Sequence, residues 1–377
     1  MIFGRRILLY LSDNSSDNPF ATFTVENSTL LQNYTSDGSA SSSVSGFVGI
    51  MVFLALFGGY IFTSVLLLKF PTLLHRKKQI KFRPLHISHR GGAAENLENS
   101  MEAFKFAESV GTEMFELDCH LTKDEKVVVS HDNHLMRTCG MDVNISDTDY
   151  SELPPMKNRI RVDFFQSMYG EGEDQRIPLL EEVFRDFPHM PVNVDIKVDN
   201  ELLMQKVDGL IRQYQREDLT AWGNRSNSIC DKLYKLNPQV PLIFSMRKVV
   251  SLLVLFWTGL LPFVPIRESL LEVVVPGLLL DSEFIFDRQL SKKVKWFFWL
   301  MDKLLMRPSL ISHLDKRGIQ TYLWVLNREE DFERAMCLGV AGIMTDRVTL
   351  LADFLQRRKG GQAGNSYNSI ENRTKLL

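Results

Sequence analysis

The chain has 377 residues, of which 45% are hydrophobic and 24% are charged, and its formal net charge at pH 7 is −2. This composition is that of a globular protein with room for one large domain and an appended segment. The near-neutral charge argues against a nucleic-acid-binding protein, since such proteins are usually basic. The four cysteines show no paired spacing, so neither a disulfide framework nor a zinc site is indicated, and a reducing compartment is expected for the main domain.

The N-terminal region divides into a polar tail, an apolar run and a basic linker. Residues 1–43 are rich in Ser, Asn and Thr and predict a disordered tail. Residues 44–68 carry no charge and are long enough for a tilted transmembrane helix. A cleaved signal peptide fits less well, because the run is long and starts far from the N-terminus. Residues 69–84 then form a basic juxtamembrane linker.

The charges around the apolar run predict its orientation. The part of the tail next to it carries only Glu26 and Asp37 as charged residues. The linker after it contains the basic residues Lys69, Arg76, Lys77, Lys78, Lys81 and Arg83. By the positive-inside rule the main domain is cytoplasmic and the tail is outside. The tail also holds three N-x-Ser/Thr sequons, at Asn14, Asn27 and Asn33, which fits a lumenal position.

From residue 85 to 356, strand-like and helix-like segments alternate. The strand candidates are Leu85–Ser88, Met114–Leu121, Val127–Ser130, Pro191–Lys197, Leu219–Trp222, Leu242–Phe244, Val273–Leu280, Thr321–Leu326 and Gly342–Met344. Their number is near eight, so we expect an α/β protein with a (β/α)₈ TIM barrel; an open, doubly wound sheet is the alternative. Residues 357–377 are a polar tail that we expect to be disordered.

Three segments depart from this alternation. Residues 140–190 are polar and irregular, and we interpret them as an insertion over one side of the barrel mouth. Residues 249–266 are apolar but short, and a full span here would split the domain, so an interfacial or re-entrant segment that associates with the membrane is expected. A buried core helix is the alternative. The aromatic, amphipathic stretch 294–306 is expected to form, together with 249–266, an apolar rim that dips into the membrane leaflet.

Carboxylates on two predicted strands suggest a metal site. Glu116 and Asp118 are two positions apart, so both side chains lie on one face of a strand. Inside a barrel they would repel each other unless a hard cation bound between them; a solvent-exposed acidic face is the alternative. Asp195 is a candidate third ligand, and Lys197 on the same face is a candidate for binding a phosphate oxygen. A structural Asp–Lys pair is the alternative for these two residues.

Two histidines follow predicted strands near these carboxylates. A single His is more often structural, but His89 and His131 together indicate acid–base catalysis beside a metal, as in phosphoryl chemistry. Arg90, next to His89, offers a planar fork suited to a phosphate. Trp324, on a late strand, either lines the substrate pocket or packs in the barrel.

The order of these motifs resembles the glycerophosphodiester phosphodiesterase family over roughly residues 85–356. The motifs are His89-Arg90-Gly91, Glu98-Asn99-Ser100, Glu116-Leu117-Asp118, Thr122-Lys123-Asp124, His131-Asp132, Asp195-Ile196-Lys197, Trp324-Val325-Leu326-Asn327 and Gly342-Ile343-Met344-Thr345-Asp346. The resemblance implies a TIM barrel with a small insertion after the second strand and an acid–base pair of His89 and His131.

The resemblance also implies a divalent metal, Mg²⁺ or Ca²⁺, on Glu116, Asp118 and the position of Asp195, with His131 as a further candidate ligand. The family more often has Glu where this chain has Asp195. The shorter side chain would shift the metal preference or admit a water molecule.

The apolar N-terminal run and the apolar segment in the barrel resemble the animal branch of the family that acts as lysophospholipase D. This implies cleavage of lysophospholipids to lysophosphatidic acid and a head-group alcohol, on the endoplasmic reticulum or another endomembrane. The expected partners are the lysophospholipid or glycerophosphodiester substrate and membrane lipid, with no nucleic acid. A glycerophosphodiesterase for water-soluble diesters and a catalytically inactive membrane scaffold are the alternatives.

Overall fold

The computed structural model describes residues 38–163, 165, 167–280 and 290–359, and the chain divides after Gly59 into two compact units. The helix α1 (Gly38–Lys69) begins in the first unit and ends in the second. Among the described residues, Gly46–Lys69 is the one stretch long and apolar enough to cross a membrane, judged by length and composition. Residues 38–43 of the tail predicted as disordered belong to α1, and residues 357–359 of the predicted C-terminal tail 357–377 are helical as well. The remaining parts of both predicted tails, 1–37 and 360–377, lie outside the described residues.

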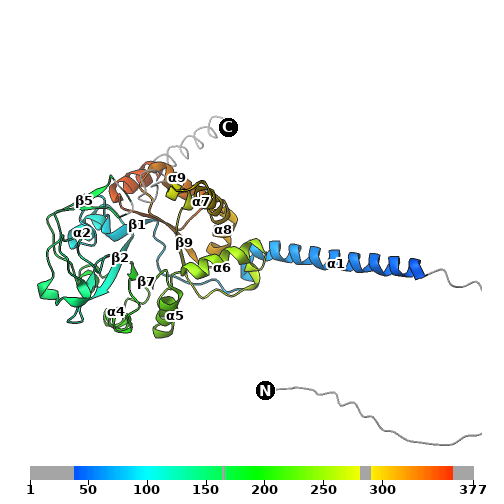
Figure 1. The fold of residues 1–377 in the computed structure, drawn as a ribbon, viewed down its shortest axis with the longest axis horizontal. Helices are drawn as coiled ribbons and strands as arrows, with labels where there is room; N and C mark the ends of the chain where they lie inside the picture. Colours follow the sequence, from blue (N-terminus) through cyan, green and yellow to red (C-terminus); the bar gives the residue numbers. More distant parts are fainter. Residues whose placement is uncertain (1–37, 164, 166, 281–289, 360–377) are drawn as a thin grey trace, which may run out of the picture. The chain divides into compact units, whose positions relative to one another are not determined.

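The second unit is built on a parallel barrel (Figure 1). Its strands are β1 (His86–Ser88), β2 (Met114–Leu121), β6 (Val192–Ile196), β7 (Thr220–Gly223), β8 (Leu270–Val274), β9 (Gln320–Trp324) and β10 (Gly342–Thr345). They pair in the order β7-β6-β2-β1-β10-β9-β8. Leu242 bridges to β7 and Ile243 bridges to β8, both in parallel, so this short segment fills the gap. The predicted TIM barrel is confirmed.

Two predicted strands differ from the observed ones. The segment at Val127–Ser130 forms β3 (Val127–Val129), which pairs antiparallel with β2 as a hairpin and is not a barrel strand. The predicted strand Val273–Leu280 began too late and ended too late. The observed strand β8 begins at Leu270 and ends at Val274, and Pro276–Leu280 is a short 3₁₀ helix, η6. Proline lacks the N–H that a ladder requires, which explains the break.

Helices surround the barrel and bury one face each. They are α2 (Met101–Ser109), α3 (Leu180–Asp186), α4 (Glu201–Gln213), α5 (Asn227–Leu236), α6 (Met246–Trp257), α7 (Lys292–Leu305), α8 (Pro308–Lys316), α9 (Glu329–Leu338) and a last helix over 348–359. In α4 the buried side chains Leu203, Val207 and Ile211 recur every four residues, as expected for an amphipathic helix. On the core side, Phe115 contacts Phe104 and Phe187 with ring centroids 5.0 Å apart in both pairs.

The stretch predicted as an insertion has its own small structure. It contains the antiparallel pair β4 (Arg159–Arg161) and β5 (Tyr169–Glu171) and two short 3₁₀ helices, η3 (Ile145–Asp147) and η4 (Tyr150–Glu152). It also contributes Ile145 and Ile160 to a buried cluster with Leu97. The insertion is thus packed onto the barrel, and α3 begins before its predicted end at 190.

The apolar segment 249–266 covers most of α6, which begins three residues before it, and the 3₁₀ helix η5 (Leu261–Phe263). Val249, Leu252 and Leu253 of α6 are buried in the barrel's hydrophobic core, whereas Val250 and Val254 are exposed. One face of the segment is therefore buried, as in the core helix that was the alternative prediction, and its other face is apolar and exposed.

Candidate active site

His89 is oriented by a buried carboxylate from the far end of the chain. It begins the 3₁₀ helix η2 (His89–Gly91) directly after β1, and its Nδ1 lies 2.6 Å from Oδ1 of the fully buried Asp346. Its Nε2 lies 3.9 Å from Oε2 of Glu116. Burial lowers the pKa of His89, but the negative charges of Asp346 and Glu116 outweigh it and raise that pKa above its ordinary value.

Asp346 is itself held in place by Asn327. The Asn327 Nδ2 donates to Asp346 Oδ2 at 2.8 Å, and the Asp346 backbone N–H donates to Asn327 Oδ1 at 2.9 Å. Neither residue was among the predicted site residues, although both lie in motifs that carried the resemblance. The available signal was the position of Asp346 directly after a barrel strand, at the same barrel end as His89.

Glu116 and Asp118 lie on β2 and are 5% and 1% exposed. In the parallel pairing of β2 with β6, Asp118 is next to Asp195. The Nζ of Lys197 lies 2.6 Å from Asp118 and 2.7 Å from Asp195, so the structure brings these three predicted residues together at one end of the barrel.

The two β2 carboxylates have opposite pKa shifts. Burial, together with the charge of Asp118, raises the pKa of Glu116 to about 8. Burial would also raise the pKa of Asp118, but the positive charges of Lys197 and Arg90 outweigh it and hold that pKa well below its usual range. The negative charge of the carboxylates at this site thus exceeds the positive charge of the neighbouring side chains. A bound cation would reduce this excess.

Glu272 on β8 is a further carboxylate at this site. It accepts a hydrogen bond of 2.6 Å from Nδ2 of Asn193, the residue paired with Glu116 in the β2–β6 register. Burial and the charge of Asp195 raise the pKa of Glu272 to about 7. The sequence reasoning missed Glu272, since the predicted strand began one residue after it.

Arg90 is buried among carboxylates, with 2% of its surface exposed. Its guanidinium lies 3.2 Å from Glu98, 3.5 Å from Asp118 and 3.5 Å from Asp163. Its backbone N–H donates to Glu116 at 3.0 Å, from a left-handed conformation with φ of 50°. Arg90 therefore connects both β2 carboxylates to the insertion that contains Asp163.

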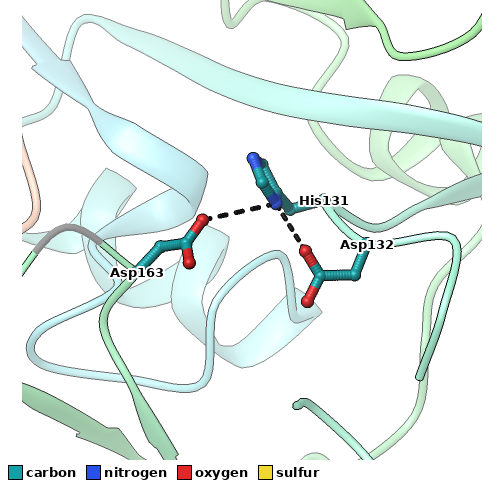
Figure 2. Close-up of side chains that lie close together, drawn as sticks. All are labelled: His131, Asp132 and Asp163. Carbon is teal, nitrogen blue, oxygen red and sulfur yellow. Dashed lines mark hydrogen bonds and ion pairs between the residues drawn. The ribbon is translucent and has the colours of Figure 1, made fainter. Parts of the chain in front are cut away.

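His131 lies against two carboxylates, as Figure 2 shows. Its Nδ1 is 2.7 Å from Asp132 and 3.6 Å from Asp163 of the insertion. Arg137 in turn donates a hydrogen bond of 2.6 Å to Asp132. Burial would raise the pKa of Asp132, but His131 and Arg137 outweigh it and hold that pKa well below its usual range. Within the described ranges, these three residues are the group whose candidate metal-ligating atoms all lie within 4.8 Å of one another.

The predicted metal set is arranged differently. Glu116, Asp118 and Asp195 are brought to the same barrel end but do not appear in such a tight group among the described residues. The Lys197 ammonium lies between Asp118 and Asp195 and offsets part of their negative charge. Trp324 ends β9, is partly exposed, and packs against hydrophobic residues of the barrel.

The model of the glycerophosphoryl diester phosphodiesterase family matches residues 89–350. The chain belongs to this family. The human protein named lysophospholipase D GDPD1 is 53% identical over 302 residues, which cover 80% of this chain and 96% of that protein. Human lysophospholipase D GDPD3 is 37% identical over 303 residues, which cover 79% of this chain and 93% of that protein.

Solved phosphodiesterase structures share the fold. The phosphodiesterase domain of a Mycobacterium tuberculosis protein superposes with a TM-score of 0.55 at 12% identity, covering 72% of this chain and 98% of that domain. An Oleispira antarctica phosphodiesterase, solved with sn-glycerol-3-phosphate, has a TM-score of 0.51 at 17% identity and covers 72% of this chain and 97% of its own. Both likenesses concern the fold. The predicted family, fold class and phosphodiesterase class are confirmed.

Proposed function

We propose that this chain is a membrane-anchored lysophospholipase D, which cleaves lysophospholipids to lysophosphatidic acid and a head-group alcohol. The observation that carries the proposal is the intact constellation of His89, His131, Glu116 and Asp118 in a chain 53% identical to a protein of that name. The inactive-scaffold alternative is disfavoured, because a barrel without catalysis has no need to keep these buried charged groups together.

The acidic residues fit a hard divalent cation. Glu116, Asp118 and Asp195 would hold Mg²⁺ or Ca²⁺, both of which prefer oxygen ligands. Burial, together with the charge of Asp118, raises the pKa of Glu116, and a bound cation would stabilise its ionised form. A bound cation would neutralise charge on the phosphate. The positive charges of Lys197 and Arg90 add to the attraction for the phosphate, and His131 remains a further candidate ligand.

The two histidines would carry out the proton transfers. One imidazole takes a proton from the attacking oxygen, either water or a neighbouring glycerol hydroxyl, and the other protonates the leaving alcohol. Asp346 orients His89 and Asp132 orients His131, each through Nδ1, which leaves Nε2 of each ring for the substrate. Trp324 would line the pocket beside them.

The substrate can be tested with the purified full chain. Lysophosphatidylcholine and glycerophosphocholine are each supplied with Mg²⁺, Ca²⁺ or EDTA, and release of choline is measured. Preferential turnover of lysophosphatidylcholine that EDTA removes is expected. Preference for glycerophosphocholine would favour the water-soluble alternative, and turnover of neither would favour the scaffold.

We further propose that α1 spans an endomembrane once, such as that of the endoplasmic reticulum, with the barrel in the cytoplasm. The length and apolar composition of Gly46–Lys69 and the basic residues after it support this orientation. The expected result is glycosylation at Asn14, Asn27 or Asn33 and digestion of the barrel by protease added to intact microsomes. Protection of the barrel would contradict the orientation.

A further inference from the structure

One side of α6 is apolar and exposed. Met246, Val250, Val254 and Trp257 follow each other at helical spacing and are 62%, 54%, 57% and 50% exposed. The opposite side of the same helix is buried in the core, so α6 is apolar on both faces. A helix at the surface of a soluble domain would normally carry polar residues on its outer face.

The first half of α7 has the same character. Its exposed apolar residues are Val294, Trp296, Phe297 and Trp299, of which the two tryptophans are 61% and 50% exposed. Tryptophan is enriched where proteins meet the boundary between lipid and water, because its ring is apolar and its N–H is polar.

The helices α6 and α7 lie on the same side of the barrel (Figure 1). The indole Nε1 of Trp257 donates to the backbone oxygen of Leu304 in α7 at 3.2 Å, which joins the two helices. We call this surface the apolar flank; it comprises Met246, Val250, Val254, Trp257, Leu260, Phe263, Val294, Trp296, Phe297 and Trp299. Soluble monomers seldom expose so many large apolar side chains together.

The apolar flank is continuous with the place where α1 joins the barrel. Tyr60 and Ser64 belong to the same compact unit as the barrel. The Tyr60 hydroxyl donates to the Thr258 carbonyl at 2.5 Å, and the Ser64 hydroxyl donates to the Gly259 carbonyl at 2.7 Å. The Tyr60 ring also stacks on Phe263, with centroids 6.3 Å apart. The last turns of α1 are thus hydrogen-bonded to the edge of the apolar flank.

Gly259 permits this close attachment. Its φ is +76°, and a Cβ at this position would lie 2.9 Å from the Ser64 hydroxyl and 3.0 Å from that of Tyr60. A side chain would therefore clash with the helix as well as strain the backbone. The local sequence is built to hold the end of α1 against the end of α6.

Basic residues accompany the aromatic ones at the start of α7. Lys292, Lys293 and Lys295 are exposed and alternate with the apolar residues of the first turns. Lysines interspersed with Trp, Phe and Val suit the interface of an anionic membrane, because the long lysine side chains can extend to the lipid phosphates while the aromatic rings contact the acyl chains. A self-associating surface would instead bring these lysines of two copies together.

We propose that the apolar flank lies in the head-group and upper acyl region of a phospholipid bilayer, in the cytoplasmic leaflet next to the end of α1. The occupant of this surface is membrane lipid and not a second copy of the chain. The inference rests on the proposal that α1 spans a membrane; it does not depend on the reaction or on the metal.

The test compares two positions of equal exposure in the full chain. Phe297 on the flank and Met141 on the insertion are both 51% exposed. Each is replaced by Cys in a Cys337→Ser background, which removes the exposed native thiol, and is labelled with a polarity-sensitive fluorophore. The chain is reconstituted into vesicles of phosphatidylcholine and phosphatidylserine, with or without brominated acyl chains.

The label at 297 is expected to shift to the blue on reconstitution and to lose most of its emission to bromolipid, whereas the label at 141 does neither. An unchanged label at 297, or equal quenching at both positions, would overturn the proposal. A blue shift at 297 without bromolipid quenching, together with a cross-linked dimer, would also overturn it, because a second copy would then cover the flank. Glycosylation of the tail sequons reports separately whether α1 has inserted.

Intrinsic fluorescence supplies a second measurement without labels. Of the five tryptophans, Trp257, Trp296 and Trp299 lie on the flank, and Trp222 is fully buried. Bromolipid is expected to quench a large part of the wild-type emission and to quench a clearly smaller part in the W296F/W299F variant. Equal quenched fractions in the two proteins would contradict the proposal. Circular dichroism checks that the variant is folded.

Discussion

Nδ1 of His89 and Oδ1 of Asp346 lie 2.6 Å apart although 257 positions separate the two residues in the chain. They meet because β1 and β10 are neighbouring parallel strands, and each residue directly follows its strand. Carboxyl ends of parallel barrel strands converge on one face, where TIM-barrel enzymes place their catalytic groups. Asp346 is therefore a positioning residue for the imidazole.

Replacing Asp346 by Asn should lower kcat by about 10²–10⁴-fold, because the ring loses the charge and the acceptor that fix its orientation. The pH profile of kcat should also shift, which a merely structural defect would not cause. The matched control is Asp208→Asn, a buried carboxylate that binds Arg212 and Asn237 away from the site. An Asp346→Asn enzyme with wild-type kcat and pH profile would refute the role.

The catalytic assignments predict loss of turnover without loss of fold. His89→Ala removes a proton-transfer group and should lower turnover by about 10²–10⁴-fold. Glu116→Gln removes a proposed metal ligand and should have an effect of similar size. Choline release and circular dichroism are measured on the same samples. Near-normal rates in either folded variant would show that the assignment is wrong.

Removal of divalent metal should abolish turnover, and added Mg²⁺ or Ca²⁺ should restore it. Glu272 bonds Asn193 beside Glu116, so Glu272→Gln should raise the metal concentration needed for half-maximal rate by about 10–100-fold. Glu330→Gln, an exposed position at the start of α9, is the control and should leave the metal titration unchanged. If the metal titration of Glu272→Gln coincides with that of wild type, Glu272 does not contribute to metal binding.

His86 predicts a loss of stability in mild acid. Burial lowers its pKa from 6.5 to about 4, so the folded protein keeps the ring neutral while the unfolded chain protonates it. The contribution is present above pH 6.5 and is lost as the pH falls toward 4.

Between pH 7 and pH 5 the free energy of unfolding should therefore fall further in wild type than in His86→Gln, by about 2 kcal/mol. Urea denaturation in detergent at the two pH values measures this difference. Other acid-sensitive groups are common to both proteins and cancel in the comparison. Parallel losses in the two proteins would mean that His86 is charged, or reaches water, in the folded state.

Local patterns in the sequence were sufficient for much of the fold and for part of the site. The bounds of β2 were predicted correctly, because a run of alternating residues between turn signals is a local property. For the same reason, the shared face of Glu116 and Asp118 follows from a period of two along one strand. The strand-end positions of His89 and His131 could likewise be read along the chain.

The partners of these residues depend on which strands become neighbours. Asp346 reaches His89, Glu272 reaches Asn193, and the insertion brings Asp163 to Arg90 and His131, all through contacts between distant segments. The antiparallel pairing of β3 with β2 was missed for this reason too, since a short apolar run does not state which strand it will pair with. The chain itself thus determined the elements, the family and the reactive side chains. The closed barrel determined which of those side chains are buried together, because strand register and burial exist only once the sheet has formed.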